Sequence, residues 1–443
     1  MQPAFDAHDP PSLQLIDECV HCGFCLSSCP TYLLWGEEMD SPRGRIYLMR
    51  EGLQGEPLSA AMVSHYDRCL GCVACEPACP SGVQYGKLIE ATRQQVERRY
   101  PRSIPERMYR DLLYELLPYP ARLSALRPLL ALARRLGLLS RATRLPLPER
   151  LQTVTRLGEV MPLSTAQVPE WTPAAGDERL RVGLLLGCIQ RAFFSEVNAA
   201  TTRVLSADGC GVAAPGAQGC CGALSEHGGR RDEALRLARR LIDTFETADV
   251  DVIAVNVAGC GSMMKEYGYL LRDDPMYAER ARRFSERVRD VSELLQEIGP
   301  RADRHPLPMS VVYHDACHLS NAQGIRAQPR ATLRQIPGLE VREVPRERDI
   351  CCGSAGIYNL LQPNAAGDLG DRKAANVLDA KADLLVTANP GCHLQIVAAA
   401  QRHGVQLPAV HVMQVVDASI RALGVETLTR AQQGTVQVAG DGV

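Results

Sequence analysis

Two cysteine runs of identical spacing constrain the fold of this chain more than any other feature. They are Cys19-x2-Cys22-x2-Cys25-x3-Cys29-Pro30 and Cys69-x2-Cys72-x2-Cys75-x3-Cys79-Pro80. Three thiolates on one tight loop can hold three irons of a [4Fe-4S] cube, whereas the fourth lies too far along the chain and serves the other cube. The spacing therefore predicts two clusters, one held by Cys19, Cys22, Cys25 and Cys79, the other by Cys69, Cys72, Cys75 and Cys29.

A pair of structural zinc sites built from Cys-x2-Cys elements is the alternative for these runs. Two complete copies of the longer run, each ending in Cys-Pro, favour iron-sulfur clusters. The 39 residues between the runs exceed the needs of a compact hairpin ferredoxin, so we expect a helical ferredoxin module over residues 1–100. Arg43 and Arg45 are expected to hydrogen-bond cluster-facing carbonyls or dock an acidic partner, and a solvated turn is the alternative.

The length of 443 residues exceeds what one hydrophobic core comfortably supports, so two or three domains are expected. A formal net charge of -2 gives no global attraction to nucleic acid, and we expect no nucleic-acid partner. Many cysteines in a large chain without a signal segment indicate a reducing cytoplasm. No run of 18 apolar residues occurs, so the expected location is cytoplasmic, or peripheral to the inner face of the cytoplasmic membrane.

A segment rich in Pro, Leu and Arg, residues 101–178, connects this module to the rest of the chain. Between Tyr119 and Arg150 it holds seven arginines and one acidic residue, Glu149, with leucines at near-helical spacing. Repeated prolines are expected to break it into short helices. We predict that this basic amphipathic face packs on the protein itself or on a partner subunit, and an anionic membrane surface is the alternative.

An internal duplication organises the second half of the chain. Four cysteines recur at offsets of 129, 131, 131 and 132 residues: Cys188, Cys220, Cys221 and Cys260 in the first copy, and Cys317, Cys351, Cys352 and Cys392 in the second. Each copy has an apolar run before its first cysteine, then a Cys-Cys-Gly, then a run that ends in Gly-Cys. We expect two copies of one folding unit, residues 179–300 and 301–425, related by a pseudo-twofold and followed by a tail over 426–443.

Short β-branched runs alternate with helical patterns in each copy, which predicts parallel βαβ units. The cysteines follow predicted strands, and functional groups of such sheets gather at the carboxyl ends of the strands, so each set is expected to converge. Converging thiols in a reducing compartment indicate metal binding or redox chemistry, and each set is a further candidate metal site. The alternatives are small buried hydrophobes, which we predict for Cys210, and vicinal disulfides.

Histidines lie next to the cysteines of the second copy, at His314, His318 and His393. We expect them to orient or tune the second site, and an imidazole ligand that completes it is the alternative. The chain as a whole is predicted to be an α+β multidomain protein, with a helical two-[4Fe-4S] ferredoxin module followed by two duplicated α/β Cys-Cys-Gly domains.

Longer segments carry a resemblance to a known family: CVHCGFCLSSCPTYLLWGEEMDSPRGRIYLMR, RCLGCVACEPACPSGVQYGKLIE, GCCGA, AGCGSMMKEYGYLLRDDPMYAERA, CCGSAGIYNLLQP and VTANPGC. Through them the chain resembles, nearly end to end, the iron-sulfur subunit of bacterial glycolate oxidase (glycolate dehydrogenase). The resemblance implies partnership with a flavin-containing catalytic subunit, where glycolate becomes glyoxylate, and with a further flavin-type subunit. It also implies that electrons pass towards the respiratory chain, with a quinone at the membrane as the acceptor.

Relatives with a similar plan supply the alternatives: an equivalent subunit of a lactate or anaerobic glycerol-3-phosphate dehydrogenase, or a catalytic subunit like that of heterodisulfide reductase. In heterodisulfide reductase relatives the third cysteine run ends Cys-x2-Cys and the domains hold additional iron-sulfur clusters. Here the last position is Met263 in the first copy and Gln395 in the second. The full ligand set of those relatives is absent, so an additional cluster at either Cys-Cys-Gly domain stays open.

The chain has no Gly-x-Gly-x-x-Gly after a strand, no Walker A run and no flavin fingerprint. Without a dinucleotide site it has no obvious place to oxidise an alcohol by itself, so the hydride acceptor is expected on a partner. We therefore expect an electron-transfer subunit with no catalytic residue of its own. The rival hypotheses are a self-contained reductase that uses the Cys-Cys-Gly sites, and an iron-sulfur scaffold or sensor.

Overall fold

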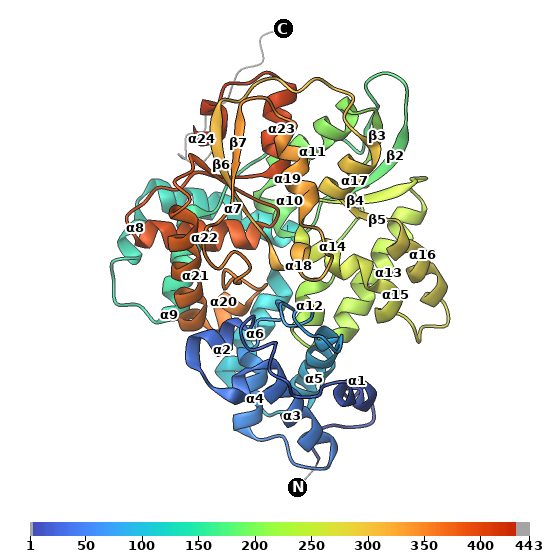
Figure 1. The fold of residues 1–443 in the computed structure, drawn as a ribbon, viewed down its shortest axis with the longest axis vertical. Helices are drawn as coiled ribbons and strands as arrows, with labels where there is room; N and C mark the ends of the chain where they lie inside the picture. The colour runs from blue at the N-terminus through green and yellow to red at the C-terminus, as the bar shows by residue number, and fades with distance from the viewer. Residues whose placement is uncertain (1–2, 431–443) are drawn as a thin grey trace.

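A computed structural model describes residues 3–430 (Figure 1). The N-terminal helices form one end of the molecule, and two α/β units stand side by side at the other end. The predicted α+β multidomain plan, a helical module ahead of two related α/β units, is confirmed. The domain boundaries stay predictions. The expected tail begins as a short helix, α24 (Glu426–Arg430), and residues 431–443 lie outside the described residues.

The N-terminal module consists of short helices and one 3-10 turn around the two cysteine loops. These elements are α1 (Leu13–Asp17), α2 (Pro30–Trp35), η1 (Glu38–Asp40), α3 (Pro42–Leu53), α4 (Ala60–Arg68) and α5 (Tyr85–Arg99). Pro30 and Pro42 open helices α2 and α3, where a missing N–H costs nothing. Tyr66, Met49 and Leu88 are fully buried in the core between the helices. This core holds both cysteine loops at the ends of helices.

The connector forms four helices, α6 (Ile104–Leu116), α7 (Pro120–Arg135), α8 (Leu138–Ala142) and α9 (Glu149–Val160). Prolines stand at the starts of α6, α7 and α9, as predicted, whereas Pro128 lies inside α7 without ending it. Leu123 of α7 is buried, but Leu129, Leu132 and Leu136 are exposed. The predicted packing on the protein itself is present on one side of α7, where Leu123 and Leu130 join an apolar core, whereas Leu129 and Leu132 leave an exposed face. A partner subunit or a membrane surface remains for that face.

The first α/β unit has a five-stranded sheet in the order β1-β3-β2-β4-β5, of which β2 to β5 are parallel and β1 is antiparallel to β3. The strands are β1 (Trp171–Thr172), β2 (Leu180–Leu185), β3 (Cys210–Ala213), β4 (Val252–Val255) and β5 (Val288–Asp290). The helices are α10 (Ile189–Phe193), α11 (Ser195–Ala207), α12 (Ala223–His227), α13 (Arg231–Glu246), α14 (Ala258–Lys265), α15 (Tyr267–Leu270), α16 (Ala278–Glu286) and α17 (Val291–Ile298). The unbroken apolar strands are buried on both faces, as parallel strands require.

The second α/β unit repeats the same strand order without the extra edge strand, β7-β6-β8-β9, with all strands parallel. Its strands are β6 (Met309–His314), β7 (Leu339–Arg342), β8 (Leu384–Thr387) and β9 (Ala409–His411). Its helices are α18 (Cys317–Ser320), α19 (Ala327–Arg334), α20 (Tyr358–Leu361), α21 (Pro363–Leu378), α22 (Pro390–Arg402) and α23 (Val412–Ile420). The duplication read from the cysteines is therefore a duplication of fold.

The two units pack reciprocally. Helix α11 of the first unit contacts α23 of the second, and the equivalent pair, α17 and α19, makes the matching contact. Such an exchange of equivalent helices is the signature of a twofold relation. One apolar core, with Val182, Leu184, Val311 and Val386, extends through both units. Among residues 3–430, no helix combines the length and the apolar character needed to cross a bilayer.

Candidate metal centres

The two ferredoxin cysteine loops share one backbone conformation. In the first loop His21 and Gly23 have φ angles of 53° and 87°, and the equivalent Gly71 and Val73 in the second have 66° and 47°. Each loop thus takes the left-handed conformation immediately before and after its second cysteine. This repeated turn allows a short loop to direct three thiols towards one centre.

Arg43 closes the first loop from outside. Its Nη1 donates to the His21 carbonyl at 3.0 Å, and its Nε lies 2.6 Å from Glu38 Oε1. A Cβ at Gly23 would lie 2.6 Å from Arg43 Nη1, so this position needs glycine for space as well as for its φ. Of the alternatives for Arg43, the structure contains the hydrogen bond to a loop carbonyl.

The fourth cysteine of each run lies among the thiols of the other run. Burial raises the pKa of Cys19, and Cys79 is among the charged neighbours that raise it further. Burial likewise raises the pKa of Cys75 well above its ordinary value, with Cys72, Cys69 and Cys29 all contributing. The exchange of fourth ligands therefore agrees with this placement, and the ligand assignment itself stays a prediction.

The two predicted clusters differ in exposure. Cys22 is exposed and Cys19, Cys25 and Cys79 are half-buried, whereas all four cysteines of the second set are buried. The described cysteines are free thiols, and backbone N–H groups reach them, as when Gly71 N donates to Cys69 Sγ at 3.3 Å. Soft thiols, free of disulfides and met by N–H donors, fit iron-sulfur clusters.

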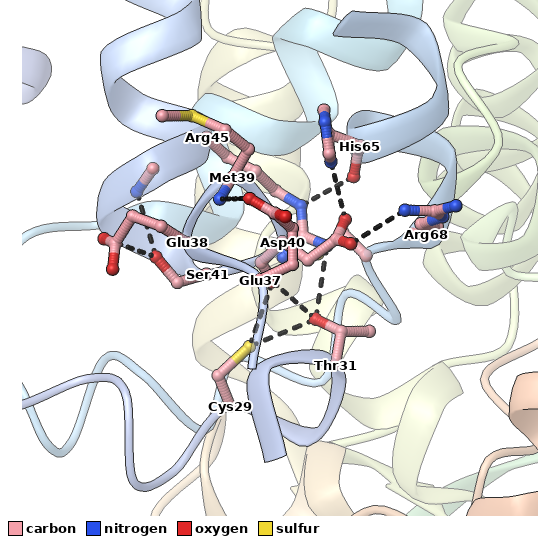
Figure 2. A network of polar contacts seen from close by, with 12 residues as sticks. Cys29, Thr31, Glu37, Glu38, Met39, Asp40, Ser41, Arg45, His65 and Arg68 are labelled. Carbon is pink, nitrogen blue, oxygen red and sulfur yellow. Dashed lines mark hydrogen bonds and ion pairs between the residues drawn. The ribbon is translucent and has the colours of Figure 1, made fainter. Parts of the chain in front are cut away.

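A buried polar network supports Cys29 (Figure 2). Cys29 Sγ lies 3.2 Å from Thr31 Oγ1, which donates to the Asp40 carbonyl at 2.6 Å. The Asp40 carboxylate is fully buried and meets Arg45, His65 Nδ1 at 2.9 Å and Arg68 Nη1 at 2.9 Å. A carboxylate without exposure needs such cationic partners. The network ties helices α3 and α4 to the loop that carries Cys29.

Arg45 lies within electrostatic reach of Cys69 and Cys29, which come from the two different cysteine runs. Its Nε donates to the His65 carbonyl at 2.6 Å, and its guanidinium is fully buried. Burial opposes ionisation of Cys69, but Arg45 and Arg93 outweigh it and lower the pKa of this thiol. A fixed positive charge at this point favours the thiolate that a cluster requires.

The eight Cys-Cys-Gly cysteines and Cys69 line one cavity of about 180 Å³ between the two α/β units and the ferredoxin module. In the first copy Cys188 precedes α10, Cys220 and Cys221 precede α12, and Cys260 lies in the first turn of α14. Cys188 Sγ lies 3.7 Å from Cys220 Sγ. Contacts continue from Cys220 to Cys221 and from Cys221 to Cys260. The predicted convergence of this set is therefore present in the structure.

The second copy has an equivalent chain of thiols. Cys317 contacts Cys351, and Cys352 contacts both Cys351 and Cys392. Cys351 also contacts Cys72 of the second ferredoxin loop. Sequence reasoning did not find this link, because Cys72 and Cys351 are far apart in the chain and belong to different motifs.

Glycine is required after each cysteine pair for a physical reason. Gly222 and Gly353 have φ angles of 84° and 85°. A Cβ at Gly353 would lie 2.6 Å from the Ala366 carbonyl of α21, and one at Gly222 would lie 3.2 Å from the Ala234 carbonyl of α13. The left-handed turn against a helix directs the adjacent thiols into the cavity. Cys210, in contrast, lies buried in the apolar core around β3, as predicted.

The histidines of the second copy have different surroundings. His318 Nδ1 lies 3.5 Å from Cys317 Sγ, and its ring packs 5.1 Å from that of His227. His393 packs edge-on against Phe194 at 5.2 Å. His314 lies with Cys352 and Cys392, and their ligand atoms are all within 4.8 Å of one another. Burial lowers the pKa of His314 to about 3, so its imidazole is neutral.

Known proteins share these features. A family described as "4Fe-4S dicluster domain" matches residues 15–83, and one described as "Cysteine-rich domain" matches residues 182–265 and 311–397. The chain is 38% identical over 427 residues to the probable glycolate oxidase iron-sulfur subunit of Bacillus subtilis, covering 92% of this chain and 94% of that one. It is 36% identical over 404 residues to the glycolate oxidase iron-sulfur subunit of Escherichia coli, covering 89% and 93%.

A third relative matches a shorter part. Lactate utilization protein A of Bacillus licheniformis is 31% identical over 240 residues, which is 54% of this chain and 99% of that protein. The match lies in the cysteine-rich half. Of these three relatives, the two glycolate oxidase iron-sulfur subunits match across both the ferredoxin module and the duplicated units.

Proposed function

The chain belongs to the family of glycolate oxidase iron-sulfur subunits, and from this premise we propose that it carries electrons within a glycolate-oxidising complex. A flavin-containing catalytic subunit oxidises glycolate to glyoxylate, a further flavin-type subunit completes the complex, and this chain passes the electrons towards the respiratory chain. The observation that carries the proposal is the contact between Cys72 and Cys351, which joins the ferredoxin module to the duplicated units.

In this proposal the cysteines act as cluster ligands. Cys19, Cys22, Cys25 and Cys79 hold one [4Fe-4S] cluster, and Cys69, Cys72, Cys75 and Cys29 hold the second. When bound, these clusters supply one-electron redox chemistry. The chain contributes the thiolates, the N–H donors and the buried Arg45 that together set the reduction potential.

We propose that electrons enter at the first loop. Cys22 is exposed, and the adjacent Val20 and Phe24 are 68% and 66% exposed. Apolar side chains beside a redox centre are suited to a protein partner, since they favour close approach and water exclusion. The second cluster site is buried and lies against Cys351. This position favours it as the cluster that receives electrons from the first one.

We further propose that the connector attaches the complex to the inner face of the cytoplasmic membrane, near a quinone acceptor. Within residues 3–430, more than half of the exposed large apolar side chains lie between residues 104 and 154. Arg135, Arg141 and Arg144 are also exposed. They lie on or beside helices α7 and α8, which carry exposed leucines of this group. Leucines interleaved with arginines favour an anionic lipid surface.

The test uses the complex. Anaerobic mixing of this chain and its flavin-containing partners with glycolate should give the EPR signals of reduced clusters within one turnover, as dithionite does. Reduction by dithionite but not by glycolate would contradict the proposal. Lactate and glycerol-3-phosphate are tested with the same complex. Cluster reduction by one of them in place of glycolate would favour the corresponding alternative dehydrogenase.

The cavity favours a second candidate, a reductase like the catalytic subunit of heterodisulfide reductase. Nine cysteines, the eight of the Cys-Cys-Gly units and Cys69, line one space of about 180 Å³, enough for a small disulfide to approach a cluster. This candidate predicts that the isolated chain, given an artificial reductant, turns over a disulfide. If the complex transfers electrons but the isolated chain does not reduce a disulfide, only the electron-transfer function remains.

A further inference from the structure

The two Cys-Cys-Gly sites differ in the side chains that surround their cysteines on the neighbouring strands and on the covering helix. Leu185 ends β2 and pairs with Val255, whereas the equivalent His314 ends β6 and pairs with Thr387. On the covering helices, Leu241 of α13 corresponds to Lys373 of α21, because Ala234 and Ala366 make the same contact with the glycine of the motif. All six of these side chains are buried. The first copy thus has an apolar back wall where the second has imidazole, hydroxyl and ammonium groups.

Buried polar groups without partners are costly and call for an explanation. His314 is 1% exposed, and neither Nδ1 nor Nε2 has a hydrogen-bond partner. The Oγ1 of Thr387 beside it is likewise without one. Leucine and valine at these positions in the first copy show that the fold itself does not need polar side chains here.

The position of His314 supplies an explanation. One ring nitrogen and the thiols of Cys352 and Cys392 lie within 4.8 Å of one another. Metal–sulfur and metal–nitrogen bonds of about 2.3 and 2.0 Å place the ligand atoms of one tetrahedral ion about 3.5–3.8 Å apart. The three groups therefore lie within about 1 Å of the separation that one ion requires, and side-chain movements of that size complete the site.

We propose that the second Cys-Cys-Gly site is an iron centre with a mixed ligand set, in which His314 binds iron beside Cys352 and Cys392. The first site has cysteines alone. The inference deepens the proposed electron-transfer function and rests on it only for the choice of iron, since imidazole and thiolates also suit zinc. The contact of Cys351 with Cys72 places the site next to a redox centre and favours iron.

Lys373 lies against the same site, and burial lowers the pKa of its amine. It is fully buried, its Nζ donates to the Arg348 carbonyl at 2.9 Å, and it lies within electrostatic reach of Cys351, Cys352 and Cys392. An uncharged imidazole in the ligand set gives an iron-sulfur centre a higher potential than thiolates alone give. The second site is therefore the one that draws electrons from the ferredoxin module.

The test is pulsed EPR of the anaerobically isolated full chain, reduced with dithionite, with and without ¹⁵N-labelled histidine. Directly bound nitrogen gives a strong hyperfine coupling that changes on labelling. We expect this coupling, with iron clearly above the roughly eight atoms of two [4Fe-4S] clusters. His314→Leu should abolish the coupling and shift the remaining signal to lower potential, and it should leave the ferredoxin signals unchanged. His318→Leu, beside Cys317 in the same cavity, is the matched control and should retain the coupling.

Several outcomes would overturn the inference: iron for two cubes only, zinc in place of the extra iron, or no strong nitrogen coupling. Should His314→Leu fail to fold, labelling of the unmodified chain still decides. Reduction by glycolate in the complex is measured separately, so a failure of the proposed function is distinguishable from a failure of this assignment.

Discussion

Cys72 of the second ferredoxin loop contacts Cys351 of the second Cys-Cys-Gly pair. Neighbouring bonds hold the contact in place: Asn321 Nδ2 donates to the Cys72 carbonyl at 3.3 Å, and the Tyr358 hydroxyl donates to the Arg68 carbonyl at 3.0 Å. In the first copy, by contrast, the thiols have other cysteines of the same copy as their main partners. We therefore expect a relay along this chain to run through the second copy.

Exchange of the fourth ligands predicts which variants share a defect. Cys22→Ser and Cys79→Ser should lose or convert the same cluster, although their positions belong to different runs, because both thiols serve the first cube. Cys29→Ser should instead share its defect with Cys72→Ser. EPR of the reduced proteins checks the pairing, and Cys210→Ser, in the apolar core, is the control with unchanged iron content. Pairing of Cys22 with Cys29 would refute the exchange.

The contact with Cys351 predicts a defect in the relay. Cys351→Ser should leave both ferredoxin signals in place, because this thiol belongs to neither predicted cube, yet slow their reoxidation by the acceptor at least tenfold. Freeze-quench EPR of the complex during glycolate turnover measures this rate. Cys220→Ser, the equivalent position in the first copy, is expected to slow it less. Equal effects of the two variants would remove the special role of the second copy.

Much of this architecture could be predicted from the cysteines alone. Spacing fixes which thiols share a loop, and the period of the repeat predicts two related sheets, because both are local properties of sequence. The contact of Cys72 with Cys351 could not be predicted, since it depends on how separate units dock. His314 was expected at the second site, but its grouping with Thr387 and Lys373 depends on which side chains of β6, β8 and α21 face one another. The offset between Leu185 and His314 was the available signal, because it shows a histidine where the first copy has leucine.

The buried Asp40 network predicts a large loss of stability. Asp40→Ala leaves Arg45 buried without its carboxylate partner, and breaking a buried pair in this way costs about 3–5 kcal/mol. Glu38→Ala, which removes the half-exposed partner of Arg43, should cost at most about 1 kcal/mol. Thermal unfolding under anaerobic conditions compares the two variants. Similar Tm values would mean that Asp40 contributes no more than a surface pair.

Asp290 predicts a pH dependence of stability. This carboxyl caps α17 through Ser292 N at 2.8 Å, and burial raises its pKa from 3.8 to about 6. Because the folded state holds the proton more tightly, the stabilisation is full below about pH 4 and is lost as pH rises to about 6, by about 3 kcal/mol in total. Asp290→Asn keeps a capping side chain but does not ionise. The Tm of the unmodified protein should therefore fall relative to this variant between pH 4.5 and 6.5, and a constant difference would contradict the assignment.

The arginines of the connector predict binding to anionic membranes. Each arginine near an anionic surface contributes about 1 kcal/mol, so Arg135→Gln, Arg141→Gln and Arg144→Gln together should weaken binding to phosphatidylglycerol vesicles roughly 100-fold. Co-sedimentation of the complex measures this binding, which high salt should reduce. The control replaces three exposed arginines of the α/β units, Arg282, Arg334 and Arg346, and should leave binding unchanged. Equal binding to neutral phosphatidylcholine vesicles, or loss of the partner subunits from the triple variant, would assign this surface to another role.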